Sequence, residues 1–323
     1  MSAVPSLEQL RLLTRVARLY HEQGVRQREI AERLRLSQPR VSRLLRLAED
    51  AGIVRTTVIV TPGIYTDLEE TLAQRYGLVD AHVVDVFSDE EDALHRDLGT
   101  AAAAYFEAVL VDEGVIAFAS WSRPLQAMVE ALRTSRGLTA SHVVEILGDL
   151  GPPPVQHRVA GATQRLADLT KAEPVFLRTA GVAASTDVRD ALLRQDPYAK
   201  QTLRLLDDVD LALVGIGPLD VSESLLTSDG SLFTAEQTAE LRGLGAVGNI
   251  NLRFFDADGE PVHASVDELV VGMSLDQLKR ARRVIGIAGG AAKHDAIRAA
   301  LRGGLIDVLI TDTSSAERLI AEP

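Results

Sequence analysis

Cysteine is absent from the 323-residue chain, so the sequence excludes disulfide bonds and thiolate metal sites. This composition suits the reducing cytoplasm. No charged leader with an apolar core opens the sequence, and no apolar run approaches the ~18 residues of a membrane-spanning helix. From these absences we expect a cytoplasmic protein that does not associate with membranes.

Motifs for metal, nucleotide and acyl-transfer chemistry are missing too. The seven histidines form no pair at metal-ligand spacing, and there is no Walker loop and no GxSxG elbow. The segment 286–290, GIAGG, lacks the full GxGxxG spacing of a dinucleotide site. The sequence therefore predicts no metal, no cofactor and no catalytic residues.

Lysine is scarce, with four residues in all, and the arginines are unevenly distributed. The net charge of the chain is −12. Residues 1–60 hold eleven arginines against six carboxylates, a balance of +5, so residues 61–323 carry −17. A basic segment joined to an acidic one is typical of a DNA-binding module attached to a second domain.

Residues 26–46, RQREIAERLRLSQPRVSRLLR, carry the pattern of a helix-turn-helix. Apolar residues at helical spacing predict helices over 7–22, 27–34 and 38–50. The β-branched run 53–60 predicts a strand, as in the wing of a winged helix-turn-helix. We expect this domain to occupy residues 1–60 and a second domain to occupy residues 61–323, with a TPG linker signal where they meet.

Local signals define the turn between the second and third helices. Ser37 stands where a helix N-cap is expected, since its hydroxyl can accept a backbone N–H of the first turn. Pro39 falls in that first turn, where its missing N–H costs little. Arg35 stands where a glycine is common, and a left-handed arginine would be mildly strained. The arginine therefore indicates a turn that is built differently.

The third helix is predicted to enter the major groove of duplex DNA. Arginine pairs bidentately with guanine, so Arg40 and Arg43, together with Gln38, are the candidates for reading base edges. The other candidate DNA-binding residues, expected at phosphates or at the helix start, are Gln27, Ser37, Ser42 and Arg46. An oligomer would read an inverted repeat.

Beyond the linker, short apolar runs alternate with longer helical stretches. This alternation predicts a mostly parallel sheet with helices on both faces, a Rossmann-like α/β fold. Strands are predicted at 81–86, 115–119, 143–147, 209–214, 284–288 and 307–311. Helices are predicted at 90–110, 124–135, 187–206, 234–243, 291–302 and 313–321. Because ligands of such folds bind beyond the carboxyl ends of strands, the loops there are the candidate site.

The loop after the strand at 115–119 leads directly into a helix and carries hydroxyls and a guanidinium. Its residues are Ser120, Trp121, Ser122 and Arg123. A helix start with these groups is suited to an anion. The alternative is an ordinary capped helix with the tryptophan in the core.

Glycine turns follow two other strands. Gly289 and Gly290 precede Lys293, and this combination suits a phosphate or carboxylate because glycine N–H groups can approach a ligand closely. The alternative is a solvated lysine on a helix. The loop 215–218, GIGP, is interpreted as either a ligand loop or a tight turn.

Two further segments offer carboxylates. Gly148 and Asp149 follow a strand and form either a ligand loop or a plain turn. Asp256 and Arg253 precede a hairpin signal, where a carboxylate could bind sugar hydroxyls or the two residues could form a structural salt bridge. The sequence leaves both alternatives open.

Five ordered segments resemble the SorC family of bacterial sugar-binding transcriptional regulators over nearly the whole chain. They are QREIAERLRLSQPRVSRLLRLAEDAGIV, IAFASWSRPLQAMVEAL, DVDLALVGIGPL, GAVGNINLRFFDADGEPV and IGIAGGAAKHDAIRAALRGGLIDVLITD. The resemblance implies a winged helix-turn-helix and an effector domain similar to phosphosugar isomerases. It also implies a homo-oligomer, usually a tetramer, that responds to a sugar, polyol or sugar phosphate.

The resemblance places the effector near Ser120–Arg123, Gly148-Asp149, Asp256 and Lys293. The family loop usually reads SWGRTL, whereas Ser122 and Pro124 replace its glycine and threonine here. A proline offers neither an N–H nor a hydroxyl, so an unphosphorylated ligand is an alternative to a phosphate ester.

We expect a regulator whose operator affinity is controlled by the bound effector. The alternative is a sugar-phosphate isomerase or deaminase with an accessory DNA-binding head, in which Asp149 or Asp256 would serve as the base and Lys293 would form a Schiff base. No acid/base pair is evident from the spacing, and the basic head favours the regulator.

Overall fold

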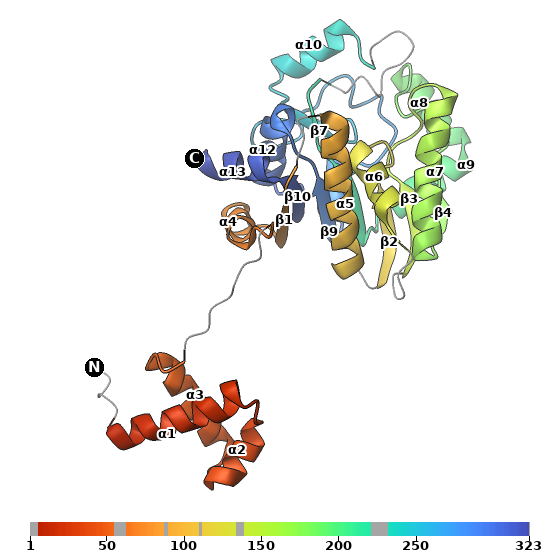
Figure 1. Cartoon of the computed structure of the whole chain (residues 1–323). Helices are drawn as coiled ribbons and strands as arrows, with labels where there is room; N and C mark the ends of the chain where they lie inside the picture. The colour runs from red at the N-terminus through yellow and green to blue at the C-terminus, as the bar shows by residue number, and fades with distance from the viewer. Residues whose placement is uncertain are drawn as a thin grey trace. The chain divides into compact units, whose positions relative to one another are not determined.

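The computed structural model of the chain describes residues 6–54, 63–86, 90–109, 112–133, 139–220 and 232–322. It divides into two compact units, Met1–Thr61 and Pro62–Pro323, called the head and the body below (Figure 1). Each unit has a hydrophobic core of its own. Within the described ranges, no helix is long and apolar enough to cross a membrane.

The head is a helix-turn-helix. Its described elements are α1 (Leu7–Ala17), the π-helical turn η1 (Arg18–Glu22), α2 (Gln27–Leu34) and α3 (Gln38–Asp50). These bounds confirm the three predicted helices. Val16, Ile30, Val41 and Leu45, one or two from each helix, are buried together at the centre. Apolar side chains at helical spacing on three short helices thus form a small core.

The turn between α2 and α3 corrects two predictions. Arg35 adopts the left-handed conformation, with φ 55° and ψ 44°, so the turn is built in the ordinary way with an arginine in the glycine position. Ser37 is the N-cap of α3, but its side chain accepts no capping hydrogen bond. Pro39 lies in the first turn as predicted. The predicted wing strand at 53–60 lies outside the described residues except for 53–54, which are not in a strand.

The body is built on a seven-stranded parallel sheet. Its strands are β1 (Asp80–Val84), β2 (Asp112–Phe118), β3 (Thr139–Glu145), β4 (Glu173–Val175), β5 (Leu211–Gly215), β9 (Arg283–Ile287) and β10 (Val308–Asp312). The order across the sheet is β1-β10-β9-β5-β2-β3-β4, with every pair parallel. All six predicted strands are present. The seventh, β4, has three residues, of which one is a proline, and was not predicted.

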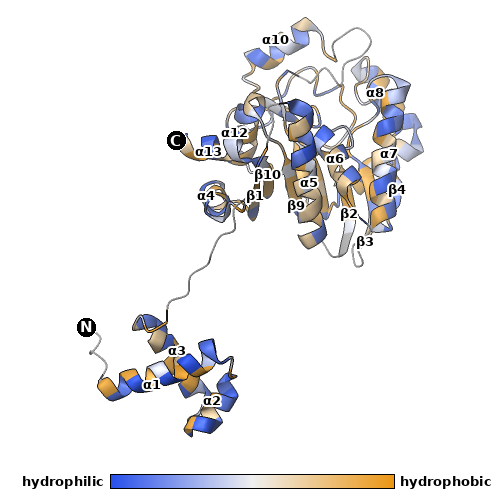
Figure 2. Cartoon of the chain, in the orientation of Figure 1, coloured by the Kyte–Doolittle hydropathy of each residue, from blue (hydrophilic) through white to orange (hydrophobic). Residues whose placement is uncertain are grey.

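Helices cover the sheet, and α5, α6 and α7 lie side by side on one face (Figure 1). The described helices are α4 (Thr66–Tyr76), α5 (Glu91–Val109), α6 (Arg123–Ala131), α7 (Pro153–Thr170), α8 (Thr186–Gln195), α9 (Pro197–Leu205), α10 (Ala235–Gly243), α11 (Leu275–Arg280), the 3-10 turn η3 (Ala291–Lys293), α12 (His294–Arg302) and α13 (Thr313–Ala321). Figure 2 shows apolar strands in the interior and polar outer faces on these helices.

The sequence missed α4, α7 and α11 and joined α8 to α9. Asp196 separates the last two helices because its side chain accepts the N–H groups of Tyr198 and Ala199 and so starts α9. The helix α7 begins at Pro153, since a proline is tolerated in the first turn of a helix.

A small antiparallel sheet lies beyond the large one. It consists of β6 (Gly217–Pro218), β7 (Gly248–Ile250) and β8 (Arg253–Phe255). The hairpin between β7 and β8 turns at Asn251 and Leu252, with φ values of 55° and 60°. Two residues with positive φ are the geometry of a type I′ turn, and a leucine there is strained.

The strand order places a topological switch point between β2 and β5. From β2 the chain proceeds to β3 and β4 on one side, and from β5 it proceeds to β9 and β10 on the other. The connections therefore diverge at the carboxyl ends of these two central strands. An open parallel sheet has its ligand crevice at such a point.

Candidate functional site

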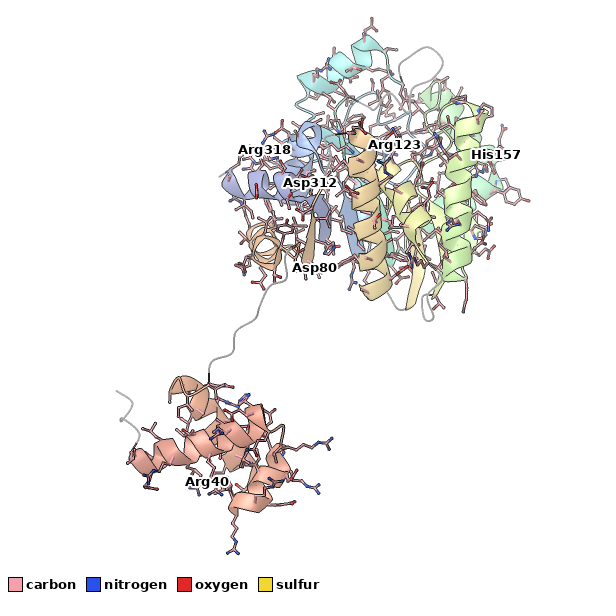
Figure 3. The ribbon with its side chains drawn as sticks, viewed as in Figure 1. Arg40, Asp80, Arg123, His157, Asp312 and Arg318 are labelled. Carbon is pink, nitrogen blue, oxygen red and sulfur yellow. The ribbon has the colours of Figure 1, made fainter. Side chains whose placement is uncertain are left out.

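The exposed face of α3 carries arginines that form no ion pair with the described residues of the head. Gln38, Arg40, Arg43 and Arg46 are exposed, whereas Val41 and Leu45 face the core. Figure 3 labels Arg40 on this surface. Four arginines that precede α3 form intrahelical ion pairs, which are Arg11–Glu8, Arg18–Glu22, Arg28–Glu32 and Arg33–Glu29. Arg15 of α1 has no ion-pair partner within the described residues. Among the residues that the structure describes, the α3 arginines have no such partner.

The remaining candidate DNA-binding residues flank this surface. Gln27 is the first residue of α2 and is half-buried. Ser37 is exposed at the start of α3, and Ser42 is half-buried on that helix. The structure thus brings all seven candidates onto two adjoining helices of one small unit.

A cavity of about 390 Å³ lies at the switch point of the body. Trp121, Ser122 and Arg123 line it after β2, and Gly215–Pro218 line it after β5. The loop after β9 contributes Lys293. Two of the loops predicted from the sequence therefore meet at one cavity, and the loop 215–218, left open as a turn or ligand loop, lies in its wall.

The first of these loops is held close to the second. Ser122 is the N-cap of α6, and its hydroxyl makes no capping hydrogen bond. A Cβ atom on Gly215 would lie 2.5 Å from the Ser122 hydroxyl oxygen, so only glycine allows this approach. Pro124, in the first turn of α6, is buried and lines the cavity. It supplies no N–H at a helix start that would otherwise suit an anion.

The charged and titratable groups of the cavity include Glu91 and His95 in the first turns of α5, together with Lys293. His95 is buried there with its Nε2 atom 3.6 Å from a Glu91 carboxylate oxygen. Burial, followed by the nearby Lys293 charge, lowers the pKa of His95 to about 4, so the ring is neutral at pH 7. Burial also lowers the pKa of Lys293, and the Glu91 carboxylate partly offsets this effect.

The glycines before Lys293 do not line the cavity. The Gly290 N–H donates to the Asp312 carboxylate at 2.8 Å and to the Ser315 hydroxyl at 3.0 Å. A Cβ atom on Gly289 would lie 2.3 Å from the same carboxylate. The expectation of N–H groups turned toward a ligand is therefore wrong for Gly290, because Asp312, the N-cap of α13, takes its N–H. Figure 3 labels Asp312 in the body.

Three more residues that were predicted to bind the effector do not line the cavity. Ser120 is buried, and its carbonyl accepts a hydrogen bond from Gln126 at 2.8 Å. Gly148 packs against the backbone of the 179–181 segment. Asp149 forms an ion pair with Arg178 at 2.7 Å, and burial raises its pKa despite that pairing. These contacts favour the alternative of a structural turn at 148–149.

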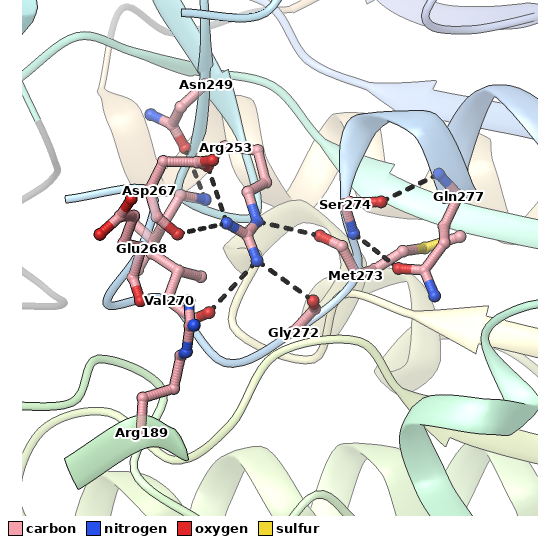
Figure 4. A network of polar contacts seen from close by, with 11 residues as sticks. Arg189, Asn249, Arg253, Asp267, Glu268, Val270, Gly272, Met273, Ser274 and Gln277 are labelled. Carbon is pink, nitrogen blue, oxygen red and sulfur yellow. Dashed lines mark hydrogen bonds and ion pairs between the residues drawn. The ribbon is translucent and has the colours of Figure 1, made fainter. Parts of the chain in front are cut away.

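Asp256 and Arg253 also make structural contacts. Asp256 accepts the backbone N–H groups of Asp258 and Glu260, both at 3.0 Å, and so shapes the predicted turn. Arg253 forms an ion pair with Asp267 at 2.7 Å. Its guanidinium also donates to backbone carbonyls of residues 267–273 (Figure 4). Asp256 does not line the cavity. Arg253 does form a structural salt bridge, but its partner is Asp267 and not Asp256.

Sequence reasoning missed several residues that do line the cavity. Glu91 and His95 come from the start of a helix, not from a loop after a strand. Asn249, Asn251 and Leu252 come from the small sheet and its strained turn. The four-residue spacing of Glu91 and His95 places them on one helix face, which is a signal that the sequence does contain.

No group of three or more metal-ligating side chains occurs among the described residues of the chain. The free groups around the cavity are instead a hydroxyl, an amide, a neutral imidazole and an ammonium. Such groups bind hydroxyls and anions by hydrogen bonds.

Comparison with known proteins identifies the class. The family model described as "Putative sugar-binding domain" matches residues 63–321, and a "MarR family" model of the DNA-binding kind matches residues 6–59. The chain belongs to the SorC family of sugar-binding transcriptional regulators. The resemblance inferred from the five sequence segments is thereby confirmed.

Individual relatives match over almost their full length. The deoxyribonucleoside regulator of Bacillus subtilis is 30% identical over 313 residues, which cover 97% of this chain and 98% of the relative. The crystal structure of the full-length sorbitol operon regulator SorC from Klebsiella pneumoniae matches with a TM-score of 0.70 and 28% identity, covering 97% of this chain and 99% of that one. The sugar-binding domain of DeoR from Pseudomonas syringae pv. tomato is 34% identical, with a TM-score of 0.62, over 80% of this chain and 99% of the domain.

These matches define the protein at the level of its class. It is a DNA-binding transcriptional regulator in which an α/β sugar-binding domain follows a helix-turn-helix along the chain. Its relatives are regulators of transcription and not enzymes, which agrees with the prediction that the chain has no catalytic activity. The alternative of an isomerase or deaminase is therefore set aside.

Proposed function

We propose that the cavity binds a sugar, polyol or sugar phosphate, and that this effector changes the affinity of the head for operator DNA. The observation that carries the proposal is the cavity of about 390 Å³ at the switch point of the parallel sheet. Its volume lies within the range of small-molecule sites. Trp121, Ser122, Arg123 and Lys293 are the predicted effector residues that line it.

The DNA contacts are assigned to α3. Gln38, Arg40 and Arg43 read base edges, since all three are exposed in the first half of α3 and the two arginines, three residues apart, share one helix face. Gln27, Ser42 and Arg46 hold phosphates. The absence of ion-pair partners for these arginines in the described part of the head supports this assignment, because DNA phosphates and bases then supply the compensating groups.

The regulator acts in the cytoplasm as a homo-oligomer, as the family resemblance implies. We assign a tetramer that binds an inverted repeat, since the symmetry of the protein is mirrored in its operator. Sedimentation of the full-length chain tests the tetramer directly.

Trp121 provides the test of effector binding. It is the single tryptophan of the chain and lines the cavity, so all tryptophan emission comes from this site. Titration of the full-length protein with polyols, aldoses and their phosphate esters should change that emission for at least one ligand. The same ligand should change promoter affinity about 5- to 150-fold, the usual range of allosteric coupling. If no ligand changes the emission or the melting temperature, the proposal fails.

The DNA assignment has a separate test. Arg43→Ala should weaken specific promoter binding in fluorescence anisotropy by a factor that corresponds to about 1–3 kcal/mol, with the loss confined to one base position. Arg15→Ala, which removes an exposed arginine from α1, is the matched control. Equal losses for the two variants would show that charge alone, and not α3, determines binding.

A further inference from the structure

Three residues on the walls of the cavity carry neutral hydrogen-bonding groups that have no partner within the described residues. The Ser122 hydroxyl caps no backbone N–H, and the Asn251 amide makes no hydrogen bond within the described residues. The Nδ1 atom of His95 is buried and has no partner in that part of the chain either. All three residues line the cavity. Because buried polar groups are normally paired, the unpartnered Nδ1 atom of His95 points to a ligand. The half-buried Ser122 and Asn251 add further donors and acceptors on the same walls.

The charged groups on the same walls have opposite charges nearby. Arg123 forms an ion pair with Asp92 at 2.7 Å, and Asp220 forms one with Arg242 at 2.6 Å. Lys293 makes no ion-pair contact within the described residues, but the Glu91 carboxylate raises its pKa against the effect of burial. A phosphate dianion that entered the cavity would therefore compete with carboxylates for each cation. Moving such an ion out of water without uncompensated positive charge is unfavourable.

The hydrogen-bonding groups on the cavity walls also disfavour a phosphate ligand. A phosphate dianion only accepts hydrogen bonds and needs donors around it. A serine hydroxyl, a carboxamide and a neutral imidazole each offer a donor and an acceptor, which is also what a sugar hydroxyl offers. Pro124 removes one backbone N–H from the helix start at which an anion would bind.

We infer that the cavity selects an uncharged polyhydroxyl ligand, an unphosphorylated sugar or polyol, and that His95 is a specificity-determining residue which hydrogen-bonds one of its hydroxyls. The inference rests on the proposed effector function and narrows its ligand class. Ser122 and Asn251 pair with further hydroxyls. His95 suits this role because a neutral ring keeps one nitrogen free as an acceptor.

Pairs of a free sugar or polyol and its phosphate ester test whether the cavity prefers an uncharged ligand. Trp121 emission and titration calorimetry on the full-length protein compare sorbitol, ribose and fructose with sorbitol 6-phosphate, ribose 5-phosphate and fructose 6-phosphate. At least one free sugar or polyol should bind about tenfold more tightly than its ester. Tighter binding of the esters overturns the inference and leaves the effector function intact. Binding by none of the six overturns the effector function and this inference together.

Inorganic phosphate is an independent probe that needs no identified effector. The wild-type protein should show no thermal stabilisation by phosphate beyond that given by chloride at equal ionic strength. Glu91→Gln removes the carboxylate beside Lys293 and should create phosphate-dependent stabilisation. If wild type and Glu91→Gln respond equally to phosphate, the charge argument is wrong.

The role of His95 is tested by two substitutions of different chemistry. His95→Leu should weaken binding of the preferred sugar about tenfold or more, while His95→Gln, which keeps a donor and an acceptor, should retain most of it. Melting temperatures of the two variants show whether the body remains folded. Equal sugar affinities for Leu and Gln variants that melt like wild type would exclude His95 as a specificity residue.

Discussion

The guanidinium of Arg253 should be among the most important single groups for the stability of the body. Its side chain is 13% exposed and pairs with Asp267 at 2.7 Å (Figure 4). It donates to the carbonyls of Asp267, Val270, Gly272 and Met273 at 2.7, 3.2, 3.3 and 3.3 Å. One side chain therefore satisfies four backbone acceptors in a segment that has no regular secondary structure.

Arg253→Met keeps the apolar stem and removes all these donors. Breaking one partner of a buried ion pair typically costs about 3–5 kcal/mol, and the unpaired carbonyls add to this cost where water does not reach them. We therefore expect the free energy of unfolding to fall by about 4 kcal/mol in urea titrations of the full-length protein. Arg253→Lys keeps the charge but not the planar fork, so it should lose about half as much.

Arg280→Met is the control for this measurement. Arg280 faces Asp207 at 3.7 Å with both side chains more than half exposed. An exposed pair of this kind contributes about 0–1 kcal/mol. The reasoning is refuted if Arg253→Met costs less than about 1 kcal/mol, or no more than Arg280→Met.

Three other perturbations have defined outcomes. Gly99→Ala should destabilise the body by about 1–3 kcal/mol in urea unfolding, because the added Cβ would lie 2.5 Å from the Ala127 Cβ. Gly161→Ala is the helical control: its Cβ would meet no neighbour within 4 Å, so this substitution should stabilise the body by about 0.5–1 kcal/mol. The pKa of His95 is about 4 in the folded body and about 6.5 in the unfolded chain, so the unfolded chain takes up the proton first as the pH falls. The free energy of unfolding should therefore decline by about 3 kcal/mol between pH 6.5 and pH 4, and His95→Gln should remove that decline. Arg35→Gly should relieve a left-handed arginine and slow hydrogen exchange in α2 and α3 about fivefold, as a gain of about 1 kcal/mol requires; faster exchange would show that the arginine stabilises the turn.

Elements with strong local signals were predicted well. The helices α2 and α3 match their predicted bounds because both have an amphipathic pattern, and because Ser37 and Pro39 mark the start of α3. The six longer strands are apolar runs, and β5, β9 and β10 are buried over almost their whole length, so their composition identifies them. The strand β4 and the helix α7 were missed because Pro174 and the prolines at 152–154 resemble loop signals.

Of the residues that line the cavity, the sequence predicted only those that closely follow a strand of the parallel sheet. Trp121–Arg123 and Lys293 follow strand ends, so the topology of a parallel sheet brings them together. His95 reaches the same cavity from a helix start, and no rule about strand ends includes it. The N–H of Gly290 is taken by a carboxylate 22 residues later in the chain, a contact that local sequence cannot predict.

The Asn249 side chain has a consequence for the energetics of binding. Its amide donates to the Pro218 carbonyl at 2.8 Å, and its oxygen accepts the Leu252 N–H at 3.3 Å. Two segments that wall the cavity are thereby joined through one side chain. A ligand that enters such a preorganised site orders little additional chain, so the entropic penalty of association is small. Affinity then depends mainly on how well the ligand hydroxyls match groups that are already in place.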